Sequence, residues 1–170
     1  MRILGDDPGY ERLGLAVVEN DPPEKIIFSD CVRTKAGDPI AKRLGEIGSA
    51  VAACINLYKP SELAIESLLF NTNQKTALLV AAARGVVMYE AGRFGLEVTE
   101  YSPLAVKAAL TGYGRADKTQ LSKMIERILK LPRKKRLDDE YDAIAIALTH
   151  SAIFRTKSLS TPKGGLQKKT

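Results

Sequence analysis

The sequence predicts an α/β fold built on one mixed five-stranded sheet with helices on its faces. Three short apolar segments with tight connections follow one another at the N-terminus, a pattern typical of an antiparallel meander. The apolar period then becomes helical, and two further strand segments alternate with helices, which predicts two parallel strands in the same sheet. A chain of 170 residues, 45% hydrophobic and 27% charged, suits a single domain with its own core.

The three N-terminal strands are predicted over residues 2–7, 13–19 and 25–34. The segment Asp7-Pro8-Gly9 ends the first strand, because proline has no N–H to donate to a ladder. The Asp-Pro-Pro run at residues 21–23 turns the chain between the second and third strands. These connections are short, so the three strands are expected to pair in sequence order.

The first helix is predicted to follow an N-cap at Asp38, with Pro39 at its first helical position. Apolar residues recur at steps of three or four from Ile40 to Tyr58, which is the pattern of an amphipathic helix. Lys59-Pro60 ends this helix, because proline cannot continue it.

The remaining chain continues the alternation of strands and helices. From Thr156 the sequence is polar and basic without an apolar period, which predicts a disordered tail over 156–170 behind a single domain over 1–155. The predicted elements are a strand at 63–66, a helix at 74–92 and a strand at 96–101. Three further helices are predicted: one at 103–111, one that begins after the N-cap Asp117, and one at 138–154.

The net charge of +6 is unevenly distributed along the chain. Residues 1–100 hold 11 Lys and Arg against 14 Asp and Glu, whereas residues 101–170 hold 15 against 6. A basic C-terminal part favours an anionic partner, of which nucleic acid is the commonest. A solvated surface with a basic tail explains the same numbers, so charge alone does not decide between the two.

Several classes of protein are excluded by the residue pattern. No apolar run approaches the length of a transmembrane helix, and charge appears within the first seven residues, unlike a secretory signal. Cys31 and Cys54 lack metal-ligand spacing and are expected to be buried thiols of a cytoplasmic protein.

Carboxylates occur at two predicted strand ends and at the start of the last predicted helix. Asp7 and Glu66 each end a strand that the topology predicts to be central, and the two strands are expected to be adjacent. On the last helix Asp142 shares a face with either Asp139 or Asp138, and spacing leaves that choice open. Converging carboxylates suit Mg²⁺ or Mn²⁺, and two such ions can promote hydrolysis of a phosphodiester. The acidic helix start also has a plain explanation, which is compensation of the helix dipole.

Five segments in order carry a resemblance to a known family: ILGDDPGYERLG, LAIESLLF, ALLVAAARGV, SPLAVKAALTGYGRADKTQ and DEYDAIAIALTH. Over about residues 2–154 the chain resembles the RuvC family of bacterial Holliday-junction resolvases. The resemblance implies a ribonuclease H-like fold, a cytoplasmic homodimer, and cleavage of two opposed strands of a four-way DNA junction during recombination and repair. It also implies two Mg²⁺ ions per active site, with Mn²⁺ as a substitute, and the branch-migration motor proteins of the same pathway as partners.

The resemblance also assigns roles to individual residues. Lys107 and Lys118 match basic positions near the scissile DNA, and Phe70 lies where the family carries aromatics that stack on junction bases. The basic run 133–136 is expected to add phosphate contacts. The catalytic and metal-binding carboxylates are then Asp7, Glu66, Asp139 and Asp142, which leaves Asp138 as a flanking acid.

Some residues depart from the family pattern or have a plainer explanation. Asp6 stands where the family usually has an aliphatic residue, and strand alternation points it away from the metals toward a helix layer. An aromatic is often found at the Leu69 position, so the stacking role of Phe70 is open to a shift by one residue. Phe70 itself can instead pack in the core, and His150 is expected to be a structural histidine of the last helix.

Other functions remain as alternatives to junction cleavage. A ribonuclease H-type nuclease acting on RNA–DNA hybrids keeps the fold, but the lysine-bearing loop and the extra C-terminal helices argue against it. An actin-like ATPase would need two such domains, and 170 residues are too few. A junction-binding module with inactive carboxylates is the non-enzymatic alternative.

Overall fold

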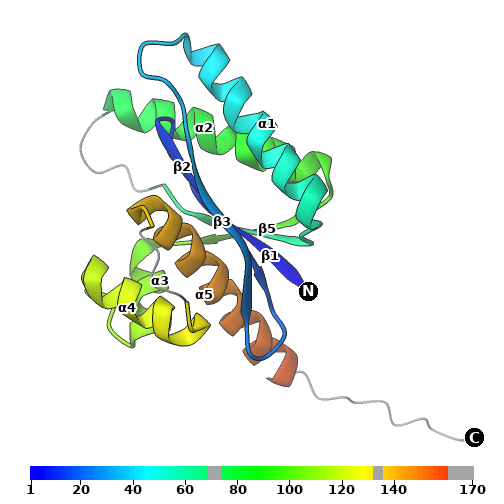
Figure 1. Cartoon of the computed structure of the whole chain (residues 1–170), viewed down its shortest axis with the longest axis vertical. Coiled ribbons are helices and arrows are strands. Elements are labelled where there is room, and N and C mark those ends of the chain that lie inside the picture. The colour runs from blue at the N-terminus through cyan, green and yellow to red at the C-terminus, as the bar shows by residue number, and fades with distance from the viewer. Residues whose placement is uncertain (69–73, 132–135, 161–170) are drawn as a thin grey trace, which may run out of the picture.

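The computed structural model describes residues 1–68, 74–131 and 136–160. In it a five-stranded sheet with the order β3-β2-β1-β4-β5 separates two groups of helices (Figure 1). The strands are β1 (Arg2–Asp7), β2 (Arg12–Glu19), β3 (Lys25–Arg33), β4 (Glu62–Glu66) and β5 (Glu97–Tyr101). The helices are α1 (Ile40–Tyr58), α2 (Gln74–Arg93), α3 (Pro103–Thr111), α4 (Lys118–Leu129) and α5 (Asp138–Ser160).

The strand pairing confirms the predicted mixed sheet. β1 pairs with β2 and β2 with β3 in antiparallel fashion, whereas β4 is parallel to both β1 and β5. β1 and β4 are therefore central and adjacent, as expected from the crossover connections. The two strands that end in Asp7 and Glu66 run side by side in the same direction.

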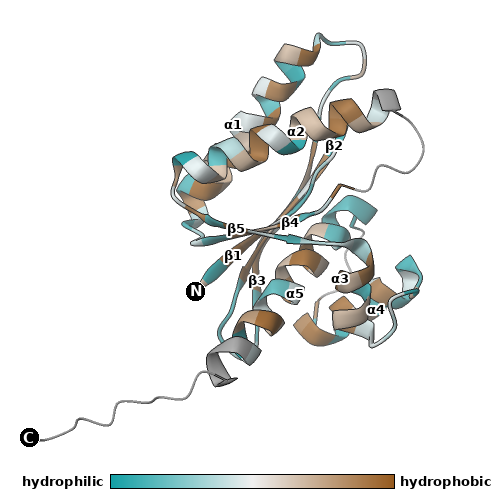
Figure 2. Cartoon of the chain, turned by 180° about the vertical axis from the view of Figure 1, so that it is seen from behind, coloured by the Kyte–Doolittle hydropathy of each residue, from teal (hydrophilic) through white to brown (hydrophobic). Residues whose placement is uncertain are grey.

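Each face of the sheet has its own core. α1 and α2 cover one face, where Leu4 and Ile65 are fully buried, and α5 covers the other with α3 and α4 outside it (Figure 1). Hydrophobic residues recur along α3 and α5 (Figure 2), and Val106 of α3 packs into the core that α5 forms against the sheet. Ala143 and Ala147 are fully buried on α5, so small side chains let this helix approach the sheet.

Two glycines set the distance between α5 and the strands. A Cβ atom on Gly5 of β1 would collide with the backbone carbonyl of Ala143, and one on Gly14 of β2 would collide with that of Asp139. Side chains at these two positions would push the helix outward. The glycines therefore fix the start of α5 directly over the ends of the central strands.

Two predicted helix boundaries are wrong. Asp38 does not cap α1: Pro39 is extended and occupies the N-cap position itself, and the Asp38 carboxylate accepts a hydrogen bond from Lys42 Nζ instead (2.7 Å). α5 continues to Ser160 beyond the predicted end at Phe154, because no glycine or proline interrupts residues 155–160. Residues 156–160, predicted to belong to a disordered tail, are therefore helical, and residues 161–170 lie outside the described part.

Other sequence expectations concern buried and reactive side chains. His150 is structural as predicted: its Nδ1 and the Tyr101 hydroxyl are hydrogen-bonded at 3.0 Å, inside the core. Cys54 is buried, but Cys31 on the edge strand β3 is only partly so, and neither forms a disulfide. Within the described ranges, no helix is both long and apolar enough to cross a membrane.

Candidate active site

Asp7 and Glu66 end neighbouring strands on the same face of the sheet. β1 and β4 pair in parallel with Asp6 opposite Ile65, so the next residues, Asp7 and Glu66, are also side by side. Side chains alternate along a strand, and Ile65 packs in the α1/α2 core. Asp7 and Glu66 therefore face α5, at the edge where parallel strands commonly place ligand sites.

The first turns of α5 bring two further carboxylates to this edge. Asp139 lies over β2, because its backbone carbonyl sits directly above Gly14. Asp142 is one helical turn further along, on the same side of the helix. Four carboxylates separated by up to 135 residues in the sequence therefore gather at one place, as predicted.

The carboxylates affect one another's ionisation. Burial, together with the negative charges of Glu66, Asp142 and Asp139, raises the pKa of Asp7 to about 8. Burial and the charge of Asp142 raise the pKa of Glu66 to about 7. Such shifts arise where like charges crowd without a compensating cation. They show that these four side chains occupy a common electrostatic environment.

Two cations pair with the helix-borne carboxylates. Arg12 Nε lies 3.3 Å from Asp139 Oδ2, and Lys118 Nζ lies 3.6 Å from Asp142 Oδ2. Burial raises the pKa of Asp142 in spite of the opposing charge of Lys118. Lys118 also lies 3.4 Å from Asp138, whose side chain is 69% exposed, so Asp138 is at the rim of the site.

The two lysines predicted near the DNA both lie beside the carboxylates. Lys118, at the start of α4, lines a cavity of about 130 Å³ together with Asp138, Tyr141 and Asp142. Its side chain is 65% exposed and accessible from solvent. Lys107 on α3 is close enough to lower the pKa of Glu66, against the larger effect of burial. Positive charge therefore borders the acidic edge from the α3/α4 side.

The donor set at this edge fits a hard divalent cation. Four carboxylates supply only oxygen donors, and burial with the charges of neighbouring carboxylates raises the pKa values of Asp7 and Glu66, which a bound cation would lower. Among the residues that the structure describes, no three His, Cys, Asp or Glu side chains already stand in a metal-binding arrangement. Arg12 and Lys118 hold two of the carboxylates instead, so ion binding would compete with these ion pairs.

Other predicted contacts have different outcomes. Arg136, from the basic run 133–136, is not a phosphate contact: its side chain is 6% exposed and pairs with the buried Glu140 at 3.2 Å. Arg136 lies two residues before the start of α5, and its charge is balanced by Glu140 in the first turn of that helix. Phe70, Leu69 and residues 133–135 lie outside the described residues.

Sequence reasoning did not identify two arginines near the site. Arg12 follows the Asp7-Pro8-Gly9 turn and pairs with Asp139, which is 127 residues away in the sequence. Arg84 on α2 reaches the backbone of Glu66 from the opposite face of the sheet. The ALLVAAARGV segment did contain Arg84, but a single arginine in an alanine-rich helix carries no local signal of what it contacts.

Comparisons with known proteins agree with this arrangement. The chain matches the family model for crossover junction endodeoxyribonuclease RuvC over residues 3–150. A relative with the same description from Moorella thermoacetica is 42% identical over 153 residues, covering 89% of this chain and 92% of the relative. The structure of Thermus thermophilus RuvC in complex with a Holliday junction substrate is 33% identical with a TM-score of 0.87, covering 93% of this chain and 97% of that one. The yeast mitochondrial Holliday junction resolvase, 13% identical with a TM-score of 0.70, shares the fold.

Proposed function

The chain belongs to the RuvC family of crossover junction endodeoxyribonucleases, and we propose that it cuts two opposed strands of a four-way DNA junction at a Mg²⁺-dependent site. The convergence of Asp7, Glu66, Asp139 and Asp142 carries this proposal. Strand-borne and helix-borne carboxylates meet at the carboxyl edge of two adjacent parallel strands, and burial with mutual repulsion raises the pKa of Asp7 to about 8. The family is one of metal-dependent nucleases, and the donor set is the kind that such chemistry needs.

The four carboxylates would hold the metal, with Asp7 between the strand-borne and helix-borne groups. Two Mg²⁺ ions bound there would supply Lewis-acid activation of the attacking water and of the leaving oxygen. The carboxylates would orient that water without a histidine base, since the only histidine of the chain, His150, is buried against Tyr101. Mn²⁺ has similar ligand preferences and is expected to substitute.

Lys118 and Lys107 would neutralise the phosphate that lies over this edge. The Lys118 ammonium sits between the rim acid Asp138 and the inner acid Asp142, and it is exposed enough to turn toward DNA. Lys107 lies on the Glu66 side of the site. We place these two lysines on either side of the scissile phosphate, where a positive charge stabilises the developing negative charge.

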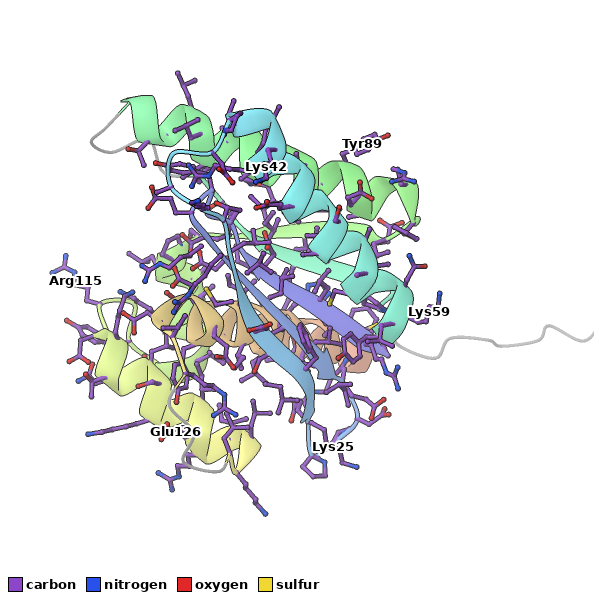
Figure 3. The ribbon with its side chains drawn as sticks, turned by 45° about the horizontal axis from the view of Figure 1, so that its top comes forward. Lys25, Lys42, Lys59, Tyr89, Arg115 and Glu126 are labelled. Carbon is purple, nitrogen blue, oxygen red and sulfur yellow. The ribbon has the colours of Figure 1, made fainter. Side chains whose placement is uncertain are left out.

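The wider DNA surface would be the layer formed by α3 and α4. Arg115 extends outward from the loop between these helices (Figure 3). Residues 103–131 contain six Lys and Arg against two Asp and Glu, so this layer is basic. Contacts to phosphates position a nucleic acid without reading its sequence. Junction shape and phosphate spacing are therefore expected to dominate recognition.

A homodimer would match the two-fold symmetry of a four-way junction. The outer surface of α1 and α2 carries a groove of about 390 Å³ lined by small and apolar residues such as Gly48 and Val86, together with the charged Glu90 and Arg93. Tyr89 points outward beside it and is 65% exposed (Figure 3). We place the second copy on this face, which leaves both acidic edges and both α3/α4 layers free for DNA.

The cellular setting follows from the substrate. Four-way junctions arise during recombination and repair of chromosomal DNA, so the proposed location is the bacterial cytoplasm. The branch-migration motor proteins of that pathway are proposed as partners, because they act on the same junction. Co-purification of the motor proteins with this chain on junction DNA, and its absence on linear duplex, tests that part.

A cleavage assay on matched substrates tests the proposed function. A synthetic four-way junction, a linear duplex of the same sequence and an RNA–DNA hybrid are each incubated with the protein and Mg²⁺. We expect paired nicks in opposed strands of the junction and little cutting of the other two. Preferential cutting of the hybrid would favour the ribonuclease H-type alternative, and junction binding without cutting would favour a non-catalytic module.

Two neighbouring acids provide a matched pair of variants for the site assignment. Asp139→Asn should lower the cleavage rate by about a hundredfold or more, because a metal ligand is lost. Asp138→Asn changes the same charge one residue away, at an exposed position, and should keep cleavage within about threefold. The reverse order of the two effects would show that the helix presents the other acid to the metal.

Mixed dimers test the proposed assembly. Wild-type protein is combined with an excess of Asp7→Asn protein, so that most wild-type chains have an inactive partner. Such dimers should nick one strand of a junction and leave the opposed strand intact. If the ratio of paired to single nicks is the same as for wild-type protein alone, a dimer with one active site per subunit is contradicted.

A further inference from the structure

Arg84 lies behind the candidate active site, on the opposite face of the sheet. It belongs to α2, and its side chain is 13% exposed. Its Nε donates a hydrogen bond to the backbone carbonyl of Glu66 at 3.3 Å, and its Nη2 lies 2.7 Å from Glu100 Oε2 on β5. One side chain therefore joins α2 to the carboxyl ends of β4 and β5.

The Glu66 carbonyl needs a donor from outside the ladder. In the trans peptide between Glu66 and Ser67, the C=O and the N–H point in opposite directions. The Ser67 N–H donates to the Tyr101 carbonyl on β5, at 2.9 Å, so the Glu66 C=O points toward β1. The residue that follows Asp7 there is Pro8, which has no N–H. Arg84 supplies the donor that Pro8 cannot.

Asp6 adds a second link between Arg84 and the site. It precedes Asp7 on β1, is 0% exposed, and neither of its carboxylate oxygens has a hydrogen-bond partner among the described residues. Burial and the charge of Asp7 raise the pKa of Asp6 well above its ordinary value, and the positive charge of Arg84 opposes this shift. Arg84 is thus coupled to the strand that carries Asp7 as well as to the strand that carries Glu66.

We propose that Arg84 is a positioning residue for the metal site, which holds the carboxyl end of β4, and with it the Glu66 carboxylate, from behind the sheet. The proposal rests on the proposed function, because Glu66 must be a metal ligand for its position to matter. Without this bond the last residue of β4 loses its donor on the β1 side, at the point where the chain leaves the sheet. The Glu66 side chain then samples more positions, and the metal binds more weakly.

Arg2 provides a matched control at the other end of the sheet. Its Nε donates to Glu19 at 3.3 Å and its Nη1 donates to the Tyr58 carbonyl at 2.8 Å. Like Arg84, it binds one carboxylate and one backbone carbonyl and so links separate elements. It lies at the start of β1, the opposite end from Asp7. Any effect of simply losing such an arginine should appear in both variants.

The test measures Mn²⁺ binding to the full-length protein without DNA, by electron paramagnetic resonance of the free ion. Arg84→Met should raise the Kd for Mn²⁺ by about threefold to tenfold, the range expected for one buried hydrogen bond. Arg2→Met should lower the melting temperature and leave the Kd unchanged. The metal concentration for half-maximal junction cleavage should shift as the Kd does, whereas metal-free junction binding should stay the same in both variants.

Further variants keep the test decisive. If Arg84→Met fails to fold because Asp6 is left without a cation, the comparison is made between Asp6→Ile and Asp6→Ile/Arg84→Met, and the same Kd ratio is expected.

Glu66→Gln separates the proposed function from the positioning role of Arg84. If Glu66→Gln cuts junctions at the normal rate, the site assignment itself is wrong. If Glu66→Gln is inactive while Arg84→Met binds Mn²⁺ as tightly as the wild type, only the positioning role is overturned.

Discussion

The strand-borne carboxylates Asp7 and Glu66 differ from the helix-borne Asp139 and Asp142 in how the protein holds them. The helix-borne pair is matched by cations, since Arg12 lies 3.3 Å from Asp139 and Lys118 lies 3.6 Å from Asp142. No cation in the described residues pairs directly with Asp7 or Glu66, and burial with mutual repulsion raises their pKa values to about 8 and about 7. The strands thus supply two carboxylates without a paired cation, and the helix supplies two carboxylates that already form ion pairs.

This difference has a structural origin. A strand end in the middle of a sheet is rigid, because ladder hydrogen bonds and two cores fix it from both faces. The start of α5 lies at the surface of the layer, where long basic side chains can reach it and move away again. We infer that the strand pair defines where an ion binds and that the helix pair adjusts when it arrives.

Asp7→Asn should have the largest effect. Asp7 interacts with all three other carboxylates, so its loss disrupts both the strand pair and the link to the helix. Cleavage should fall by about a hundredfold or more at saturating Mg²⁺. Junction binding should stay equal or become tighter, because one negative charge facing phosphate is removed. Single-turnover cleavage and metal-free binding, measured side by side, check this, and a normal cutting rate would contradict the metal-site assignment.

The pH dependence should show that the strand pair lacks a cation. In the metal-free folded state Asp7 titrates near pH 8 and Glu66 near pH 7, so between about pH 4 and 8 the native protein binds more protons than the unfolded chain does. Its free energy of unfolding should therefore fall as pH rises through this window, by up to about 1.4 kcal/mol per pH unit for each group.

Metal binding should have the opposite dependence, because the ion competes with these protons. At subsaturating Mg²⁺ the cleavage rate should fall by about tenfold per pH unit below pH 7, or more where both carboxyls are protonated. Denaturant unfolding at pH 5, 6, 7 and 8, with and without Mn²⁺, checks the stability of the metal-free protein and its metal binding, and cleavage at subsaturating Mg²⁺ over the same pH values checks the rate. A metal-free stability that rises from pH 5 to 8 would show that the strand carboxylates are neutralised by another group.

Lys118→Ala tests the helix side of the comparison. Removing this ammonium frees Asp142 and removes a charge from the DNA side of the site. We expect a fall of about tenfold in the cleavage rate with a smaller loss of junction binding, because phosphate stabilisation is greatest in the transition state. Lys130→Ala, an exposed lysine at the far end of α4, is the matched control and should change only binding and its salt dependence. If both variants lower cleavage and junction binding equally, Lys118 has no role at the scissile phosphate beyond that of any other basic residue in the layer.

Sequence patterns predicted the fold and the convergence of the four candidate carboxylates more closely than they predicted the contacts around them. Asp7 and Glu66 could be placed because each ends an apolar strand, and the connections between strands constrain which strands are neighbours. The alternation of strand side chains also predicted that Asp6 faces the α1/α2 layer, where it is fully buried. These features depend on the spacing of apolar residues and on the lengths of the connections between strands, both of which can be read from a single sequence.

The contacts that tune the site depend on packing between distant segments. Nothing near Arg12 in the sequence indicates Asp139 as its partner, and Gly14 does not reveal that α5 needs its missing side chain. For Arg136 the local pattern was misleading. Its place in a basic run predicted a phosphate contact, but its side chain is buried in an ion pair with Glu140. Such pairings follow from how closely α5 approaches the sheet, which no local pattern specifies.

Asp6→Ile should have the smallest effect on cleavage. It should instead increase the stability of the fold. Asp6 is on the same strand as Asp7 but faces the other core, so no metal ligand is lost and the cutting rate should stay within about twofold. Removing a fully buried carboxylate without hydrogen bonds should stabilise the fold by about 1–3 kcal/mol, a few degrees in melting temperature. Burial and the neighbouring Asp7 raise the pKa of Asp6 well above its ordinary value, so the folded state penalises its ionised form. The gain should therefore be larger at pH 8 than at pH 5, because the free-energy cost of keeping Asp6 protonated in the folded state, relative to the ionised unfolded chain, grows with pH. Thermal melts of both proteins at the two pH values check this. Loss of cleavage with an unchanged melting temperature would place Asp6 in the active site and would shift the register of β1 by one residue.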